Sequence, residues 1–240
     1  MADGGDQESA SGRSLALGYA AGVVAVVLAT IAVVAMIGSV AGGSDDDSVV
    51  APDPRADVTV SEEEAENLLP DKGLFEVPQE VEGVKEGAAA ADCELKSFKA
   101  VSNLHVSPAD PPVRYSSDPP TSGKHDPTPA QDGAYSVSPG VQRLVHTLEH
   151  GRVIVWFKRD LPAEDRASLK AYYDNDPRLM VLVPDTTDMD YDVAATAWNR
   201  KPSRYGTGRL LGCRDYSGDL YTALEAFKKA HRGKGPELIP

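Results

Sequence analysis

Cysteine is rare in this sequence: the chain of 240 residues has two, Cys93 and Cys213. Two cysteines are too few for a disulfide-dense scaffold, a cysteine-rich zinc module or an iron–sulfur protein. They are also far apart in the sequence, so the chain has no C-x-x-C redox motif. Cysteine chemistry can therefore supply at most one disulfide or a pair of thiols.

Sequence signals of catalysis are missing as well. The chain has no readable phosphate-binding loop, nucleophile–base pair or internal repeat. Ser122, in the sequence Thr-Ser-Gly, lacks the strand–turn–helix surroundings of a nucleophile elbow. Enzymatic activity stays open, but a binding or accessory role is the better prediction.

Positive charge is in deficit, with 24 basic against 37 acidic residues and a net charge of -13. Residues 45–96 account for most of this, because they hold 16 acidic and 4 basic side chains, whereas residues 97–240 hold 18 and 19. The C-terminal part is close to neutral, which argues against a nucleic-acid-binding surface. Its roughly 140 residues are enough for one hydrophobic core.

Charge is absent altogether from the apolar segment Leu15–Val40. As a helix this segment would be roughly 39 Å long, enough to cross a hydrocarbon core of about 30 Å. A cleavable signal has a shorter apolar region of roughly 7–15 residues, so an uncleaved transmembrane helix over residues 15–40 is favoured. Cleavage near Ser39–Ala41, where the residues are small, is the alternative.

The orientation follows from the flanking charges. Arg13 is the nearby cation on the N-terminal side, and Asp45–Asp47 follow the segment. The positive-inside rule then predicts a cytoplasmic tail over residues 1–14 and an extracytoplasmic position for the rest of the chain.

Residues 41–92 are rich in acidic residues, proline and glycine, with little apolar periodicity. Such a segment buries too little apolar surface to offset its ordering entropy, so it is predicted to be a disordered linker. Within it, Ser61 and Glu64 fit a capping box before a short helix that ends at Pro70.

Residues 93–240 are predicted to form a single extracytoplasmic domain. Apolar runs predict strands, and amphipathic patterns predict helices: strands at Leu95–Val101, Val153–Phe157, Leu179–Val183 and Val193–Trp198, and helices at Pro139–Gly151, Pro162–Asp174 and Asp219–His231. Interleaved strands and helices predict an α/β (or α+β) fold with a mixed sheet and flanking helices. Residues 116–133, rich in proline, glycine, serine and aspartate, are expected to be a long loop.

An extracytoplasmic position permits a disulfide between Cys93 and Cys213. Closing so long a loop would stabilise the fold by roughly 4–5 kcal/mol in the chain-entropy model. Two free thiols, or metal ligation by either cysteine, are the alternatives.

Histidine is the residue type that points to chemistry. His146 and His150 are four residues apart in a predicted helix and so share one face, over which the loop that carries His125 could fold. Three neutral imidazoles with a fourth position left open suit zinc or copper. We therefore predict a copper or zinc ion bound by His125, His146 and His150, with Glu149 in support.

Two other interpretations stay open. The histidines could cap the helix end and hold the loop in a metal-free domain that interacts with other envelope components. Alternatively, His146–His150 matches the H-x-x-E-H pattern of a metallopeptidase, which would need a later carboxylate such as Glu225 as third ligand. His105 and His231 are expected to be incidental.

Two stretches, PPTSGKH at residues 119–125 and LVHTLEHGRVIVWF at residues 144–157, resemble a bacterial family of membrane-anchored proteins known as domain of unknown function 3105. That family similarly has flanking cysteines and a later TAW, found here at residues 196–198. The resemblance covers most of the C-terminal domain and implies that His125, His146, Glu149 and His150 form one constellation. It also implies the bacterial cell membrane as the location, which the predicted helix would cross once. An envelope protein is a candidate partner, and the near-neutral charge of the C-terminal part predicts no nucleic-acid partner.

Overall fold

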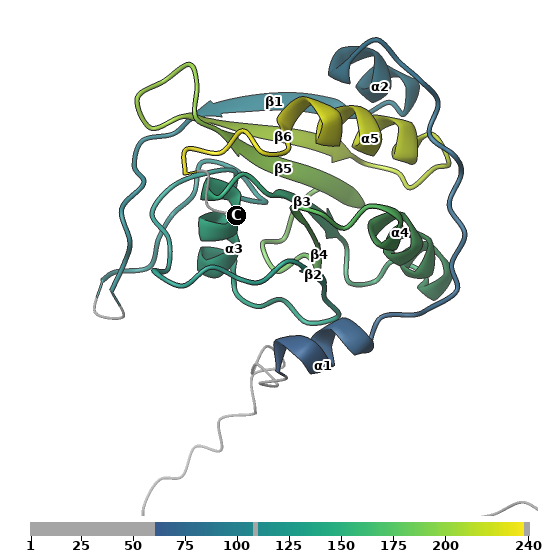
Figure 1. The fold of residues 1–240 in the computed structure, drawn as a ribbon, viewed down its shortest axis with the longest axis horizontal. Helices are drawn as coiled ribbons and strands as arrows, with labels where there is room; N and C mark the ends of the chain where they lie inside the picture. The colour runs from purple at the N-terminus through teal and green to yellow at the C-terminus, as the bar shows by residue number, and fades with distance from the viewer. Residues whose placement is uncertain (1–60, 108–109, 238–240) are drawn as a thin grey trace, which may run out of the picture. The chain divides into compact units, whose positions relative to one another are not determined.

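A six-stranded mixed sheet forms the centre of the fold (Figure 1). The computed structural model describes residues 61–107 and 110–237. The strands are β1 (Glu94–Lys99), β2 (Gly133–Ala134), β3 (Val153–Phe157), β4 (Met180–Pro184), β5 (Val193–Asn199) and β6 (Thr207–Cys213), in the order β1-β6-β5-β3-β4-β2. Strands β2, β4 and β3 are parallel, and β3, β5, β6 and β1 pair antiparallel.

Five helices accompany the sheet within the described ranges: α1 (Glu62–Asn67), α2 (Val84–Ala90), α3 (Val141–Glu149), α4 (Ala163–Asn175) and α5 (Leu220–His231). Alternate side chains of a strand point to opposite faces, so each face of the sheet has its own core. On one face Val155 shares a core with Leu169 of α4 and Phe227 of α5. On the other, Trp156 shares a core with Leu144 of α3. The predicted mixed sheet with flanking helices is confirmed, and the structure shows that the helices lie on both of its faces.

The buried strands follow the predictions closely, because runs of apolar β-branched residues suit the centre of a sheet. Strand β3 has the predicted limits, β4 is shifted by one residue at both ends, and β5 extends one residue further than predicted. Strand β6 was not predicted, because two glycines and an arginine interrupt its apolar pattern. Gly208 is needed there because a Cβ atom at this position would overlap the side chain of Thr121.

Residues 61–92, predicted as part of the disordered linker, belong to the fold. Ser61 and Glu64 form the predicted capping box at the start of α1. Ala65 and Leu69 are buried, and the Ser136 hydroxyl donates a hydrogen bond of 2.7 Å to the Ala65 carbonyl. The average composition of the segment gives no sign that Ala65 and Leu69 are buried, and these contacts attach it to the domain. Residues 41–60 of the predicted linker lie outside the described residues.

The prediction of a transmembrane helix at residues 15–40, and of a cytoplasmic tail before it, also falls outside the described residues and stays a prediction. Among residues 61–107 and 110–237, no helix combines the length and the apolar character that crossing a bilayer requires.

The predicted disulfide between Cys93 and Cys213 is confirmed, with an S–S distance of 2.04 Å and a Cα–Cα distance of 4.3 Å. It joins the residue before β1 to the last residue of β6, next to the antiparallel pair Glu94–Gly212. The bond therefore fastens the edge strand of the sheet to its neighbour, and neither cysteine is left as a thiol or a metal ligand.

Candidate metal centre

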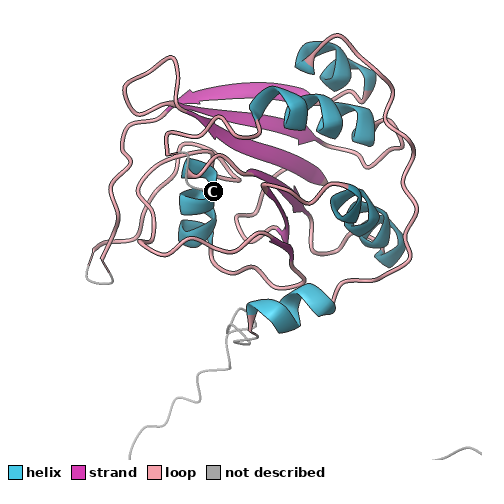
Figure 2. Cartoon of the chain, in the orientation of Figure 1, coloured by secondary structure: helices cyan, strands magenta, loops and turns pink. Residues whose placement is uncertain are grey.

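Helix α3 presents a polar edge to the loops around it because its apolar stripe faces the sheet. Leu144, Val145 and Leu148 are fully buried. The helix ends at once after Glu149, because Gly151 takes a left-handed conformation with φ 81° that turns the chain into β3. Figure 2 shows that loops, rather than strands or helices, surround most of α3. His146 and Glu149 lie on this helix, and both are buried.

The loop that carries His125 is fixed on the sheet. Thr121 is buried against Gly208 of β6, and the His125 ring lies 5.9 Å from the ring of Trp198 on β5. The His125 amide donates to the Leu104 carbonyl (3.2 Å), and the Val106 amide donates to the His125 carbonyl (2.7 Å). This short parallel bridge brings His105 opposite His125.

The structure gathers three histidines and one glutamate into a group that we call the inner group: His105, His125, His146 and Glu149. One donor atom from each lies within 4.8 Å of the others. The ring centroids of His125 and His146 are 4.7 Å apart, and the His105 centroid lies 5.0 Å and 4.9 Å from them. His105 is exposed and the other three are buried, so the group meets solvent through His105.

Backbone carbonyls fix the tautomers of the two buried histidines. Nδ1 of His125 lies 2.8 Å from the Gly123 carbonyl oxygen, and Nδ1 of His146 lies 2.7 Å from that of Asp126. A carbonyl oxygen only accepts hydrogen bonds, so each Nδ1 carries the proton that it donates. In the neutral rings Nε2 therefore has a free lone pair, which is the arrangement that orients metal-binding histidines.

The contact between His125 and Glu149 lacks a proton donor when the imidazole is neutral. Nε2 of His125 is 2.9 Å from Oε2 of Glu149, and the two side chains are 0% and 2% exposed. Neither this Nε2 nor the other carboxylate oxygen, Oε1, has a hydrogen-bond partner within the described residues. Buried acceptors without donors are costly. A cation or an extra proton between them would remove that cost.

The electrostatic environment keeps the helix histidines neutral. The pKa of His146 is lowered to about 4, mainly by burial; its hydrogen bond to the Asp126 carbonyl acts against this, and the nearby histidines act with it. Burial also lowers the pKa of His150, with Arg152 acting in the same direction and Glu237 against it. Both imidazoles are therefore uncharged at neutral pH, the state in which histidine binds metals.

His150 belongs to a second set, which we call the outer group: His146, His150 and Glu237. The rings of His146 and His150 are 4.5 Å apart, and Nε2 of His150 lies 3.6 Å from Oε2 of Glu237. The predicted trio is thus divided between two groups that share His146.

Comparison with known proteins places these residues in a family. The family model described as "Protein of unknown function (DUF3105)" matches residues 105–237, which is more than half of the chain. The chain belongs to this family. The resemblance inferred from the two motifs is confirmed, and all members of both groups lie within the matched DUF3105 region. No curated protein and no solved structure matches the chain.

Two residues of the inner group differ from the roles expected of them. Glu149 was expected only to support the histidines, yet its carboxylate lies as close to His125 Nε2 as a second ligand would. His105 was expected to be incidental, and no spacing in the sequence links it to the others. Only the bridge to His125, formed by the folded chain, brings it there. His231 lies outside both groups, against Asn199 and Phe227.

The described residues assemble only part of the peptidase arrangement: the outer group joins both motif histidines to a later carboxylate, Glu237, but Glu149 is not free to activate water. An H-x-x-E-H peptidase uses both histidines for one ion and the glutamate to activate water. Here Glu149 is buried against His125. Glu225, the suggested third ligand, instead forms an ion pair of 2.6 Å with Lys228 and accepts a hydrogen bond from Tyr172.

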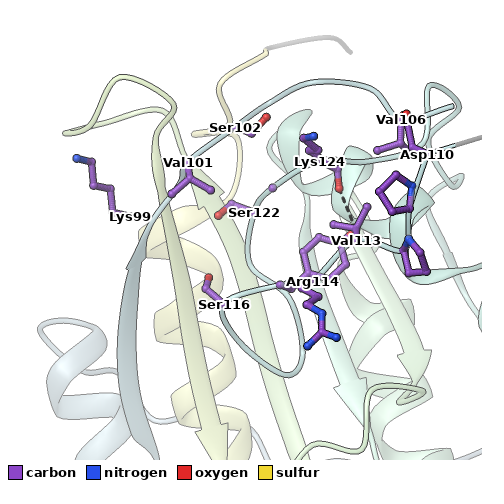
Figure 3. Close-up of a pocket in the computed structure, with 14 residues that line it drawn as sticks. Lys99, Val101, Ser102, Val106, Asp110, Val113, Arg114, Ser116, Ser122 and Lys124 are labelled. Carbon is purple, nitrogen blue, oxygen red and sulfur yellow. Dashed lines mark hydrogen bonds between the residues drawn. The ribbon is translucent and has the colours of Figure 1, made fainter.

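A pocket of about 470 Å³ is lined by the sequence neighbours of two members of the inner group (Figure 3). Its wall includes Gly123, whose carbonyl holds the His125 ring, and Val106, which follows His105. Tyr115 also lines this pocket, and its hydroxyl donates a hydrogen bond of 2.9 Å to the Lys124 carbonyl. The loop that positions His125 is therefore supported from the pocket side as well as from the sheet.

Proposed function

We propose that this DUF3105 domain binds one transition-metal ion, copper or zinc, through His105, His125, His146 and Glu149. The observation that carries the proposal is the buried contact of 2.9 Å between His125 Nε2 and Glu149 Oε2, which a cation would stabilise. Both atoms are acceptors when the imidazole is neutral, and the Gly123 carbonyl fixes the proton on the far side of the ring.

The donor types favour zinc or copper over other ions. Imidazole nitrogen with one carboxylate suits zinc and copper(II), whereas magnesium and calcium prefer oxygen ligands alone. Donors that lie about 2.0–2.1 Å from one zinc ion are about 2.9 Å apart at a right angle and about 3.3 Å apart in a tetrahedron. The His125–Glu149 distance falls at the short end of this range.

The balance of burial favours a binding role over catalysis. Three donors are buried and already oriented, while the exposed His105 can be replaced by water or by a ligand from another protein. Together with the predicted membrane anchor, this supports an accessory protein that holds a metal ion on the extracytoplasmic side of the bacterial cell membrane. An envelope protein that accepts or supplies the ion is the expected partner.

Elemental analysis of the full chain in detergent tests the proposal. After exposure to zinc or copper(II) and dialysis at pH 7, the protein should retain one ion per chain. His146→Ala should lower the affinity at least about tenfold, because it removes a central ligand. His231→Gln is the matched control, a histidine outside both groups, and should leave the stoichiometry at one. Wild-type protein without bound metal would refute the proposal.

A metal-free structural role is the second candidate, and one observation favours it. The His146 ring joins α3 to the loop through its hydrogen bond to the Asp126 carbonyl. If this bond is the purpose of the cluster, zinc should leave the melting temperature of the wild type unchanged, while His146→Ala should lower it. A metal-binding site predicts that zinc raises the melting temperature of the wild type but not that of the variant.

A further inference from the structure

The inner and outer groups share one side chain, His146. Its Nδ1 carries a proton donated to the Asp126 carbonyl, so only Nε2 can bind a metal. One lone pair serves one ion. The two groups therefore cannot both use His146 at the same time.

The two groups are unequal without His146. The inner group keeps three donors, from His105, His125 and Glu149, whereas the outer group keeps two, from His150 and Glu237. Four-coordinate zinc sites take at least three protein ligands as a rule. An ion can therefore stay in the inner group, but it can occupy the outer group only while it holds His146.

The outer group is nonetheless a built feature of the fold. The Glu237 amide donates a hydrogen bond of 3.0 Å to the Glu149 carbonyl, and the Gly233 amide donates one of 2.7 Å to the Gly151 carbonyl. These bonds fasten the C-terminal segment beside the end of α3. The His150 side chain is 11% exposed, and its Nε2 has no hydrogen-bond partner within the described residues.

Exposure rises from one group to the other. The side chains of His125 and Glu149 are 0% and 2% exposed, whereas those of His150 and Glu237 are 11% and 51% exposed. An ion that leaves Glu149 but keeps His146 would meet His150 and the exposed carboxylate of Glu237 next. The rings of His146 and His150 are already 4.5 Å apart, so the ion can pass from one group to the other without a large movement of either histidine.

We infer that the two groups are successive positions of a single ion, which enters and leaves the inner group through His150 and Glu237 with His146 bound throughout. This inference rests on the proposed metal-binding function. It assigns His150 and Glu237 to ion exchange rather than to retention. Removing either should slow loading and release together, because a change confined to the path leaves the equilibrium constant unaltered.

Zinc exchange by the full chain in detergent tests this. Stoichiometry and affinity are measured first, and then the rate of zinc transfer to an excess of a chelating dye. The wild type should bind one ion. Glu237→Gln and His150→Gln should release it at least about tenfold more slowly, with the affinity within about threefold of the wild type. Asp174→Asn, on α4 and equally exposed at 51%, is the matched control and should exchange at the wild-type rate.

The outcomes separate the two proposals. If the wild type binds no zinc, the proposed function fails and this inference fails with it. If the wild type binds one ion but both variants exchange it at the wild-type rate, the inference is wrong and the proposed function stands. A loss of affinity in Glu237→Gln as large as in Glu149→Gln would also overturn the inference alone. Two ions per chain would contradict both the inference and the one-ion stoichiometry of the proposed function.

Discussion

The two faces of the sheet differ in the partners that they provide for a buried charged side chain. On the α5 face, the Lys228 side chain is 2% exposed and forms ion pairs of 2.6 Å with Glu225 and 3.3 Å with Asp176. On the α3 face, the Glu149 carboxylate is equally buried, yet it faces a histidine nitrogen that has a lone pair when neutral. On the α5 face the buried charge is paired with side chains of opposite charge, whereas on the α3 face the pairing of Glu149 with His125 depends on a proton or a cation between them.

This difference shows where the fold gives up stability for binding. A buried charge that is paired and hydrogen-bonded is tolerated, whereas one without a partner is costly. A protein selected only for stability would have replaced Glu149 by an apolar residue or given it a donor. The α3 face is therefore expected to gain stability from a ligand, and the α5 face is not.

Lys228→Met should cause the largest change in the free energy of unfolding. It leaves Glu225 and Asp176 beside an apolar side chain, so the free energy of unfolding should fall by about 3 kcal/mol, measured by urea denaturation. Lys229→Met is the control, since its side chain is 67% exposed and its contact with Glu225 is 4.0 Å. The control should change stability by less than about 0.5 kcal/mol. Equal effects of the two substitutions would contradict the view that the buried ion pairs of Lys228 stabilise the α5 face.

Acidification should destabilise the metal-free protein through one histidine on each face. The pKa of both His146 and His231 is lowered to about 4, for each mainly by burial. Between pH 6.5 and pH 4 the unfolded state binds more protons than the folded state, so this contribution to stability is complete above pH 6.5 and is lost as the pH falls. Each histidine should account for roughly 1–2 kcal/mol of the loss between pH 7 and pH 5.

Urea denaturation at several pH values measures this dependence. His231→Gln should flatten the pH dependence of the free energy of unfolding with and without zinc, because His231 lies outside both groups. His146→Gln should flatten it in the metal-free protein. A dependence unchanged in both variants would show that other groups cause the acid sensitivity.

Glu149→Gln should have the smallest effect on stability, and one of opposite sign. A glutamine amide can donate to the lone pair of His125 Nε2, so the metal-free protein should gain about 1 kcal/mol in free energy of unfolding. The same change should weaken zinc binding at least about tenfold, because it removes a ligand. Chemical denaturation with a chelator and then with zinc measures both. A marked loss of stability without metal would mean that Glu149 is satisfied in the folded protein.

Local patterns in the sequence predicted most elements of the sheet and its helices. The run VIVWF gave β3, and the apolar stripe of Val141–Leu148 with Gly151 after it gave α3. Composition was a poorer guide to residues 61–92, because the burial of Ala65 and Ala88 depends on what they meet in the fold. Strand β6 was missed for a similar reason, since Gly208 serves a contact with a loop far away in the sequence.

The candidate site was only partly predictable. Helical spacing linked His146 to His150, and the loop motif brought in His125, but spacing along one helix does not tell which histidines share an ion. The position of His105 depends on a bridge between two loop segments, and that of Glu237 on hydrogen bonds to the end of α3. Both are non-local contacts that leave no periodic trace in the sequence.

The hydrogen bonds at the end of α3 have a practical consequence. The amides of Gly233 and Glu237 donate to the carbonyls of Gly151 and Glu149, respectively. Both are backbone groups, so neither is itself a proposed metal ligand. Their deuterium exchange therefore reports when the chain's C-terminal segment lifts off the helix, without any substitution at the site. Slower exchange of these two amides on adding zinc would record, in the unmodified protein, that the ion and this segment hold each other in place.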